Sequence, residues 1–390
     1  MNQQAISEAL AAHGLDAWLV YDFRGSNPLL AALLPCGTHL TRRVFLLLRP
    51  GRGPLVVASH IDAGQFASAG AELALYRGWE EMRALLAREL APLRRVAMEY
   101  SPGGALPVAG IVDAGTVELV RSYGVEVASS AELMQEVLAV WSDAALAAHL
   151  EDSAKVAAAK DSAFEMVRKA LADGAPVTEC KVRDHIRDCF SRDGLAWPDG
   201  PIVAVKEHSG DPHFEPTAER DRPIRKGDWL LIDLWARRPG NQHIFADITW
   251  VGACGEPSAE QLAVFDAVKA ARDAALRDAR AAWAAGRAPQ GWELDEAARR
   301  ELLAPGYGDF IRHRTGHSLS PGSKVHGLGA NLDNLETRDT RRLLPRLGFT
   351  IEPGLYLPAF GVRLEINVWM DPASGPRVTS PVQDAPLRLA

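Results

Sequence analysis

Short apolar runs alternate with helix-patterned stretches in the first third of the chain. Four of the runs are rich in β-branched or aromatic residues and have the length of buried strands. They are AWLVY (17–21), VFLLL (44–48), PLVVA (54–58) and RVAME (95–99). Between them, the segments SEALAAHG and WEEMRALLAREL place apolar side chains at helical spacing, with Gly or Pro near their ends. This pattern predicts an α/β domain.

The pattern changes near residue 130, where a long helical stretch rich in alanine and polar residues begins. Gly174 and Pro176 punctuate its end, because both residue types stop helices. A chain of 390 residues exceeds the size at which a single core usually stops growing, so we expect two domains. We place them at residues 1–140 and 141–390.

Acidic residues lie inside the apolar strand patterns of the second domain. Residues 258–287 predict a long amphipathic helix with a capping box of Ser258 and Gln261. The strand candidates around it are DWLLIDLWAR, ADITWVG, GFTIEPGLYL and GVRLEINVWM, which carry Asp233, Asp247, Glu352 and Glu365. A carboxylate on a buried strand costs several kcal/mol unless it is paired or bound to a cation. One such acid could be a hydrogen-bonded core residue, but four in one domain favour a shared function.

Divalent cations are the simplest compensation for four carboxylates in one low-dielectric site. The segment HRTGHSLSPG adds a nitrogen donor, His317, whose alternative is a structural histidine. Gly316 and Pro321 argue against a helix there, so His313 and His317 are not a zincin pair. Four carboxylates and one imidazole suit two ions such as Mn²⁺, with Co²⁺ or Zn²⁺ as alternatives that the sequence does not separate.

Composition excludes several classes of partner. The net charge of -7, with Lys and Arg dispersed, gives no footprint for nucleic acid, so we expect small or short substrates. The four cysteines form no C-x-x-C pair and fit a reducing compartment. Neither a secretion signal nor an apolar run of the roughly 20 residues that cross a bilayer is visible. The sequence therefore predicts a soluble, cytoplasmic protein with no membrane partner.

The five predicted ligands follow an order that resembles the pita-bread metallopeptidases. That family includes prolidase (Xaa-Pro dipeptidase), aminopeptidase P, methionine aminopeptidase and the metal-free creatinases. Its pattern of Asp, Asp, Gly-His, Glu-Pro-Gly and Arg-x-Glu reads here as LIDLW, ADITW, RTGHSLS, IEPGLY and VRLEIN. The resemblance covers about residues 145 to 372. It implies an α+β pita-bread catalytic domain after an α/β domain of the creatinase and prolidase type.

The resemblance also implies a role for each ligand. Asp233 would bind one metal, His317 and Glu352 the other, and Asp247 and Glu365 would bridge them. A pair of divalent ions lowers the pKa of a coordinated water and polarises the scissile carbonyl. Glu352 would then be the general base that later returns a proton to the leaving prolyl nitrogen.

Residues that face the substrate follow from spacing together with the resemblance. His213, in HSGDPHFEP, and His326, in KVHGLG, stand where the family lines its cleft with histidines. Arg363 would share a strand face with Glu365 and orient that ligand or touch substrate. Arg338 stands where prolidases carry an arginine that receives the carboxylate of a dipeptide. The alternative for His213 is a surface-loop histidine, and the alternative for Arg338 is a solvated loop residue.

Three features depart from the family pattern. His326 lies nine positions after His317, further than the family usually has it, so the intervening loop is rebuilt. Thirteen residues separate Asp233 from Asp247, which predicts a longer hairpin. The family's Tyr before the second Asp and Arg after it are replaced, with Ile244, Phe245 and Trp250 in those places. Any hydroxyl or cation that those residues supply in relatives has no counterpart there.

The function expected from these residues is cleavage of the Xaa-Pro bond in dipeptides, with a short proline-containing peptide as the binding partner. Alternatives are an aminopeptidase P that acts on longer peptides and a non-peptidase hydrolase or lyase on the same fold. A metal-free binding protein is a further alternative, and the presence of all five ligands argues against it. The resemblance implies a homodimer.

Overall fold

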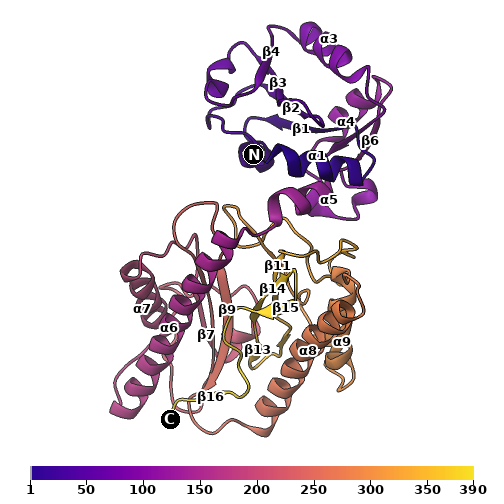
Figure 1. Ribbon diagram of the computed structural model, residues 1–390. Coiled ribbons are helices and arrows are strands. Elements are labelled where there is room, and N and C mark those ends of the chain that lie inside the picture. Colours follow the sequence, from indigo (N-terminus) through magenta and orange to yellow (C-terminus); the bar gives the residue numbers. More distant parts are fainter. Residues whose placement is uncertain (1) are drawn as a thin grey trace. The chain divides into compact units, whose positions relative to one another are not determined.

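The computed structural model describes residues 2–390, and the chain divides into two units, Met1–Leu138 and Ala139–Ala390. Each unit has its own sheets and its own hydrophobic core, and Figure 1 colours them from indigo to yellow along the chain. Among the described residues, no helix combines the length and the apolar character that a bilayer crossing requires.

A six-stranded mixed sheet with the order β4-β3-β2-β1-β5-β6 forms the centre of the first unit. Strands β1, β2 and β3 are antiparallel neighbours, whereas β4, β5 and β6 join in parallel. The strands are β1 (Ala17–Phe23), β2 (Arg43–Leu48), β3 (Leu55–Ser59), β4 (Glu72–Tyr76), β5 (Arg95–Met98) and β6 (Glu126–Ser129). The helices are α1 (Gln3–Ala12), α2 (Pro28–Leu33), α3 (Trp79–Leu90), α4 (Ala114–Arg121) and α5 (Ala131–Leu133).

The four strands predicted in this unit are the buried centre of its sheet, and the helical patterns at 7–14 and 79–90 correspond to α1 and α3. Strands β4 and β6 were not predicted. Both are edge strands, and most of their side chains are exposed or half-buried, so they lack the continuous apolar run that marks β1 or β3.

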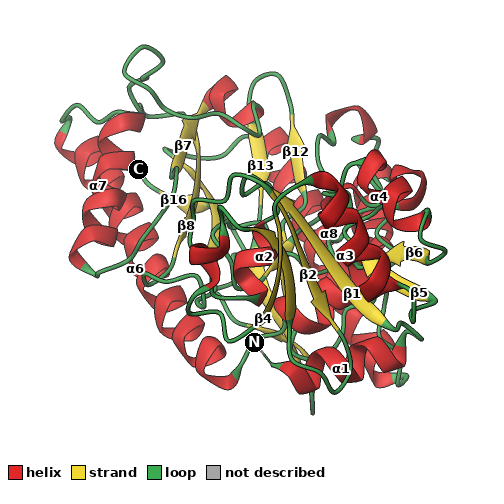
Figure 2. Cartoon of the chain, turned by 90° about the horizontal axis from the view of Figure 1, so that it is seen from above, coloured by secondary structure: helices red, strands yellow, loops and turns green. Residues whose placement is uncertain are grey.

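Two pairs of long helices support the second unit. Helices α6 (Asp143–Asp173) and α7 (Glu179–Arg192) pack on one four-stranded sheet, of order β16-β9-β8-β7. Helices α8 (Ala259–Ala284) and α9 (Gly291–Leu303) pack on each other, and α8 contacts strands β11, β13 and β15 (Figures 1 and 2). The capping box predicted for Ser258 and Gln261 is present at the start of α8.

The long helix predicted from residue 130 is interrupted. A π-helical turn at Met134–Ala139 follows α5, and α6 begins only at Asp143, where the Ser142 side chain accepts a hydrogen bond from the Ala145 N–H. Its end agrees with the prediction, because Gly174 caps α6 with a φ of 67°.

The two larger sheets of the second unit contact each other at β9. The second four-stranded sheet has the order β10-β11-β14-β15, and β9 contacts β14 of this sheet and also β13 of the two-stranded sheet β12-β13. The strands are β7 (Ile202–Val205), β8 (Trp229–Ala236), β9 (Ala246–Ala253), β10 (Ser318–Leu319), β11 (Gly348–Ile351), β12 (Gly354–Tyr356), β13 (Gly361–Arg363), β14 (Ile366–Asp371), β15 (Gly375–Val378) and β16 (Leu387–Arg388).

Two of the predicted strands are each broken in two, and the break falls at the acidic residue. GFTIEPGLYL divides into β11 and β12 at Glu352 and Pro353, because proline has no N–H to continue a ladder. GVRLEINVWM divides into β13 and β14 at Leu364 and Glu365. The chain therefore passes from the sheet of β11 and β14 into the separate β12–β13 ribbon at these two acids.

Candidate metal centre

The register of the β8–β9 hairpin places its two acids on one face. Asp233 pairs with Thr249 and Trp235 pairs with Asp247, so these side chains project from the same side of the sheet. The Thr249 hydroxyl lies 3.0 Å from Asp233 Oδ1, which agrees with that register. Asp233 and Asp247 are both buried, with 7% and 4% of their surface exposed.

Glu365 reaches the same face from the break between β13 and β14. Its backbone N–H donates to the Thr249 carbonyl, and its Oε2 lies 2.8 Å from the Thr249 hydroxyl. Glu352 arrives from the break after β11, where its backbone N–H donates to the Thr315 carbonyl and its Oε1 accepts from the Thr350 hydroxyl at 2.9 Å. Both glutamates lie at positions where strand pairing stops, which allows their side chains to turn toward β8 and β9.

His317 is held at both its backbone and its ring. Its N–H donates to the Thr350 hydroxyl, and its Nδ1 lies 3.1 Å from the Ser318 carbonyl, which can only accept. Nδ1 therefore carries a proton, and Nε2 faces Asp247 Oδ2 at 3.4 Å and Glu352 Oε1 at 3.3 Å. Gly316 must be glycine, because a Cβ there would collide with the Thr350 carbonyl.

Three of the five predicted ligands converge as a group that could hold a metal ion. One donor atom each from Asp247, His317 and Glu365 lies within 4.8 Å of the other two, and all three residues are buried. Glu365 Oε1 is buried without a hydrogen-bond partner among the described residues. A buried oxygen in that position is what an ion would satisfy, so the residues fit a divalent metal.

Burial sets the protonation of the acids. It raises the pKa of Asp247 to about 7, although the hydrogen bond with His317 opposes it. Burial and the neighbouring charges of Asp247 and Glu352 raise the pKa of Glu365 well above its usual range. Burial acts on Glu352 in the same sense, but the surrounding positive charges, His317 first and Arg363 among them, outweigh it and hold the pKa of that carboxyl below its usual value. Of these three acids, Glu352 is thus the one that stays ionised near neutral pH.

Thr249 contacts both Asp233 and Glu365 through its hydroxyl. The sequence patterns did not single out this threonine. Its oxygen contacts both carboxylates and accepts from Arg363 Nε at 3.0 Å. A hydroxyl has one proton to donate, so the second carboxylate must itself donate. The raised pKa of Glu365 identifies it as the protonated partner.

Arg363 is a buried cation that pairs with one of the acids. Its Nη2 pairs with Asp233 Oδ2, and its Nη1 donates to the Tyr356 hydroxyl at 2.8 Å. His313 Nδ1 lies 2.7 Å from the Arg314 carbonyl and Nε2 lies 2.6 Å from Tyr356, so Tyr356 donates to Nε2. Tyr356 and His313 were not assigned from the sequence. Part of the signal was present, because Tyr356 lies within IEPGLY, a motif that carries the resemblance, and His313 directly precedes RTGHSLS.

A cleft of about 790 Å³ opens over these acids. Its lining includes His213, His326 and Arg363 as predicted, together with the basic residues Arg312, Arg314 and Lys324. The ring centroid of His326 lies 4.1 Å from that of His317, whose charge lowers the pKa of His326 to about 3.

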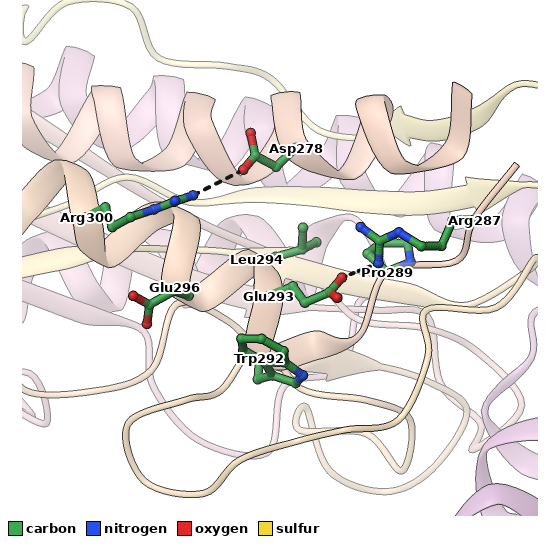
Figure 3. A pocket seen from close by; sticks show the side chains of 8 residues that line it. All are labelled: Asp278, Arg287, Pro289, Trp292, Glu293, Leu294, Glu296 and Arg300. Atoms are coloured by element: carbon green, nitrogen blue, oxygen red, sulfur yellow. Dashed lines mark hydrogen bonds and ion pairs between the residues drawn. The ribbon is translucent and has the colours of Figure 1, made fainter. Parts of the chain in front are cut away.

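Arg338 does not belong to the lining of this cleft. Its guanidinium lies over the Trp292 ring, 4.2 Å from the ring centroid. Trp292 in turn lines a separate pocket of about 230 Å³ between α8 and α9 (Figure 3). There Arg300 lies 3.5 Å from Asp278 and Arg287 pairs with Glu293, so most of the charges are already neutralised. None of the predicted ligands lines that pocket.

The residues that depart from the family pattern have structural partners. Ile244 is buried against Trp141 and Leu319, and Phe245 lies under the Arg237 guanidinium at 4.5 Å. The Trp250 ring lies 3.4 Å from Lys160 Nζ on α6, on the side of β9 away from the acids. The hydroxyl and the cation beside the acids are supplied by Thr249 and Arg363.

Comparison with known proteins identifies this arrangement. The chain matches metallopeptidase family M24 over residues 151–372, which is more than half of its length and contains all five predicted ligands. The chain belongs to this family. The M24 region begins within α6 and ends just after β14, so it includes every strand that carries a ligand.

Among curated relatives of this M24 chain, an uncharacterized peptidase of Staphylococcus aureus (strain USA300) is 28% identical over 216 residues. That match covers 55% of this chain and 56% of the relative, so the chain spans about half the length of the curated relatives it matches. The solved structure of dipeptidase PepE from Mycobacterium ulcerans has a TM-score of 0.73 at 22% identity and covers 99% of this chain and 96% of its own. X-Pro aminopeptidase from Thermotoga maritima has a TM-score of 0.63 at 21% identity, with 97% and 99% covered.

These structural likenesses confirm the predicted fold. They extend over nearly the whole chain, so they include the α/β domain as well as the pita-bread domain of the M24 family. At this level of identity they establish the fold alone.

We predict that the Thr249 hydroxyl is needed for tight metal binding. Thr249→Val keeps the shape of the side chain but leaves Asp233 and Glu365 without their shared partner, so affinity for Mn²⁺ should fall by about 10-fold or more. Isothermal titration calorimetry measures the change. Thr249→Ser retains the hydroxyl and is the matched control. A Thr249→Val protein that binds Mn²⁺ as tightly as the wild type would show that the hydroxyl has no such role.

Metal affinity should also rise with pH. The raised pKa values of Asp247 and Glu365 mean that these acids hold protons near neutrality, and an ion must displace them. Fewer protons remain to be displaced as pH increases, so affinity for Mn²⁺ should rise by about 10-fold per pH unit for each displaced proton, up to the pKa of the group that loses it, which is about 7 for Asp247. Calorimetry in two buffers of different ionisation enthalpy counts the protons released. A flat affinity with no proton release contradicts the assignment.

Proposed function

We propose that the chain is a Xaa-Pro dipeptidase, a hydrolase that uses two divalent ions to cleave the bond before proline in a dipeptide. The observation that supports it is the convergence of Asp247, His317 and Glu365 around an unpartnered carboxylate oxygen, within a chain of metallopeptidase family M24. Asp233 and Glu352 complete the proposed ligand set. Mn²⁺ is the proposed ion because the donors are mostly carboxylates, and Co²⁺ and Zn²⁺ are the alternatives.

When bound, the ions would supply an activated water and a polarised scissile carbonyl. Glu352 is the proposed general base, because its pKa is held below its usual value and it is therefore ionised at neutral pH. Its Oε1 is engaged by Thr350 and His317, which leaves Oε2 to receive the proton and to return it to the prolyl nitrogen. Arg363 orients Asp233, while His213 and His326 are proposed to contact the substrate from the cleft wall.

Substrate length is the finer part of the proposal. The cleft volume of about 790 Å³ admits a tripeptide as well as a dipeptide, so volume does not decide between them. A dipeptide ends in a carboxylate directly after proline, and a bidentate arginine would reward that group. Aminopeptidase P activity on longer peptides is the second candidate, since the solved structures that resemble this chain include an X-Pro aminopeptidase as well as a dipeptidase.

Two further expectations remain proposals. A non-peptidase reaction on the same fold would use the same acids, so only assays separate it from a peptidase. The homodimer implied by the family resemblance is tested by analytical ultracentrifugation of the purified protein, where a single species of one-chain mass would contradict it.

Rate measurements test the proposed activity. With Mn²⁺ added, we expect hydrolysis of Ala-Pro, little hydrolysis of Ala-Pro-Ala or Ala-Ala, and loss of activity after chelation. Glu352→Gln, which lacks the proposed base, is the inactive control. Cleavage of Ala-Pro-Ala alone would replace the dipeptidase proposal by aminopeptidase P. Full activity after exhaustive removal of metal would overturn the mechanism itself.

The carboxylate contact has two candidate arginines. Arg338 is the candidate from the family resemblance, and Arg312 is a cleft residue with no ion pair among the described residues. If one of them receives the dipeptide carboxylate, its replacement by alanine should raise KM for Ala-Pro by about 10-fold or more and change KM for Ala-Pro-Ala far less. We expect this selectivity in one of the two variants. Equal effects on both substrates in both variants would reject an arginine in this role.

A further inference from the structure

One wall of the cleft carries an indole and a carboxylate that the proposed chemistry does not use. Trp235 lies two residues after Asp233 on β8, so its side chain projects from the same face of the sheet as the acids. Its Nε1 donates to Asp199 Oδ1 at 2.9 Å. Both residues line the cleft, where Asp199 is exposed and Trp235 is half-buried.

The backbone beside Asp199 is fixed from two sides. Gly200 has a φ of 70°, and a Cβ at that position would lie 2.6 Å from the Trp235 ring, so only glycine allows the indole to pack there. Arg187 on α7 donates through Nε and Nη2 to the Gly200 carbonyl at 2.9 and 2.6 Å. The carboxylate of Asp199 is therefore presented by an anchored segment.

Asp199 is the unneutralised acid of the cleft wall. Glu336, another acid of the lining, lies 3.0 Å from the Arg314 guanidinium. Asp199 forms no ion pair among the described residues, and the indole N–H is the partner of one of its two oxygens. A free carboxylate oxygen beside an apolar ring surface suits a cation that arrives on an aliphatic stem.

Its position along the strand indicates which cation can reach it. Trp235 lies directly opposite Asp247 in the hairpin, and its indole N–H points away from the ring to Asp199, so the length of the indole separates Asp199 from the backbone beside the acids. The α-ammonium of a substrate is separated from the scissile carbonyl by a single carbon, whereas a lysine side chain carries its ammonium on a flexible four-carbon stem. The longer stem suits a carboxylate at the far edge of the indole.

We propose that Asp199 and Trp235 form a subsite for a basic side chain on the residue that precedes the scissile bond. The Trp235 ring packs against the aliphatic stem, and the free oxygen of Asp199 accepts from the terminal ammonium or guanidinium. The inference rests on the proposed peptidase function and adds the substrate class Lys-Pro and Arg-Pro to it.

The test compares two substrates of nearly equal shape, Lys-Pro and norleucyl-Pro, which differ by one charge. The wild type should have the larger kcat/KM for Lys-Pro. Asp199→Asn should lower that value by about 10-fold or more, because it removes the charge but keeps the size, and should change norleucyl-Pro by less than about twofold. Asp266→Asn, at an exposed aspartate on α8 outside the cleft, is the matched control.

Two further measurements distinguish a side-chain subsite from a contact with the substrate amino terminus. Asp199→Lys should reverse the charge preference, so that Glu-Pro is cleaved faster than Gln-Pro. Ala-Pro and propionyl-Pro differ only in the α-ammonium, and their ratio should not change in Asp199→Asn. A change in that ratio would assign Asp199 to the substrate amino terminus and overturn the side-chain subsite. Equal losses with Lys-Pro and norleucyl-Pro would overturn it as well.

Failure of the proposed function would be separate from failure of the subsite. If the wild type with Mn²⁺ cleaves none of these dipeptides, the peptidase proposal falls. Calorimetry with Lys-Pro and norleucyl-Pro then decides the subsite. Tighter binding of Lys-Pro that disappears in Asp199→Asn supports it, and equal binding of the two dipeptides overturns it.

Discussion

Mutual repulsion of buried carboxylates is the constraint around which the second unit is organised. Asp233, Asp247, Glu352 and Glu365 meet where water is largely excluded, and burial alone would make each of them resist ionisation. A fold that keeps such a cluster must supply positive charge, protons or donated hydrogen bonds at each oxygen. Arg363 supplies a positive charge to Asp233, Glu365 keeps a proton, and the Thr350 hydroxyl donates a hydrogen bond to Glu352.

The negative charge of the four acids is compensated differently at Asp233 and at Glu365, and this difference indicates where an ion would bind. Arg363 gives Asp233 a fixed cation, held in place through Tyr356 and His313. Glu365 instead keeps a proton and has an oxygen without a partner, next to donor atoms of Asp247 and His317. The exchangeable proton and the unpartnered oxygen belong to the same carboxyl group, so an incoming ion would both replace a proton and satisfy an orphaned atom there.

The acids were predictable from sequence because an ionisable residue inside an apolar run is conspicuous whatever lies elsewhere in the chain. Thr249 and Thr350 were not, since a threonine on a strand is ordinary and gains its role only through register with strands more than a hundred residues away or with His317. The breaks at Glu352 and Glu365 were missed for a related reason. Apolar runs predict burial but not continuity, and only Pro353 signalled that a ladder would stop. Arg338 was placed by counting from a motif, and its position over the Trp292 ring, outside the cleft lining, could not be predicted because spacing does not determine which way a loop turns.

The four acids and the Asp199 wall of the cleft are held in place by different parts of this fold. The acids lie on or beside paired strands and turn inward at residues whose backbone is hydrogen-bonded, so their geometry follows from sheet register. The cleft wall is built partly from the segment around Asp199 and Gly200, which precedes β7 and owes its position to Arg187 and to Trp235. Such contacts are made by single side chains, so they can change without disturbing the ligands. A family match can therefore locate the region that holds the four acids, whereas the proposed subsite at Asp199 depends on single contacts in this chain's own loops.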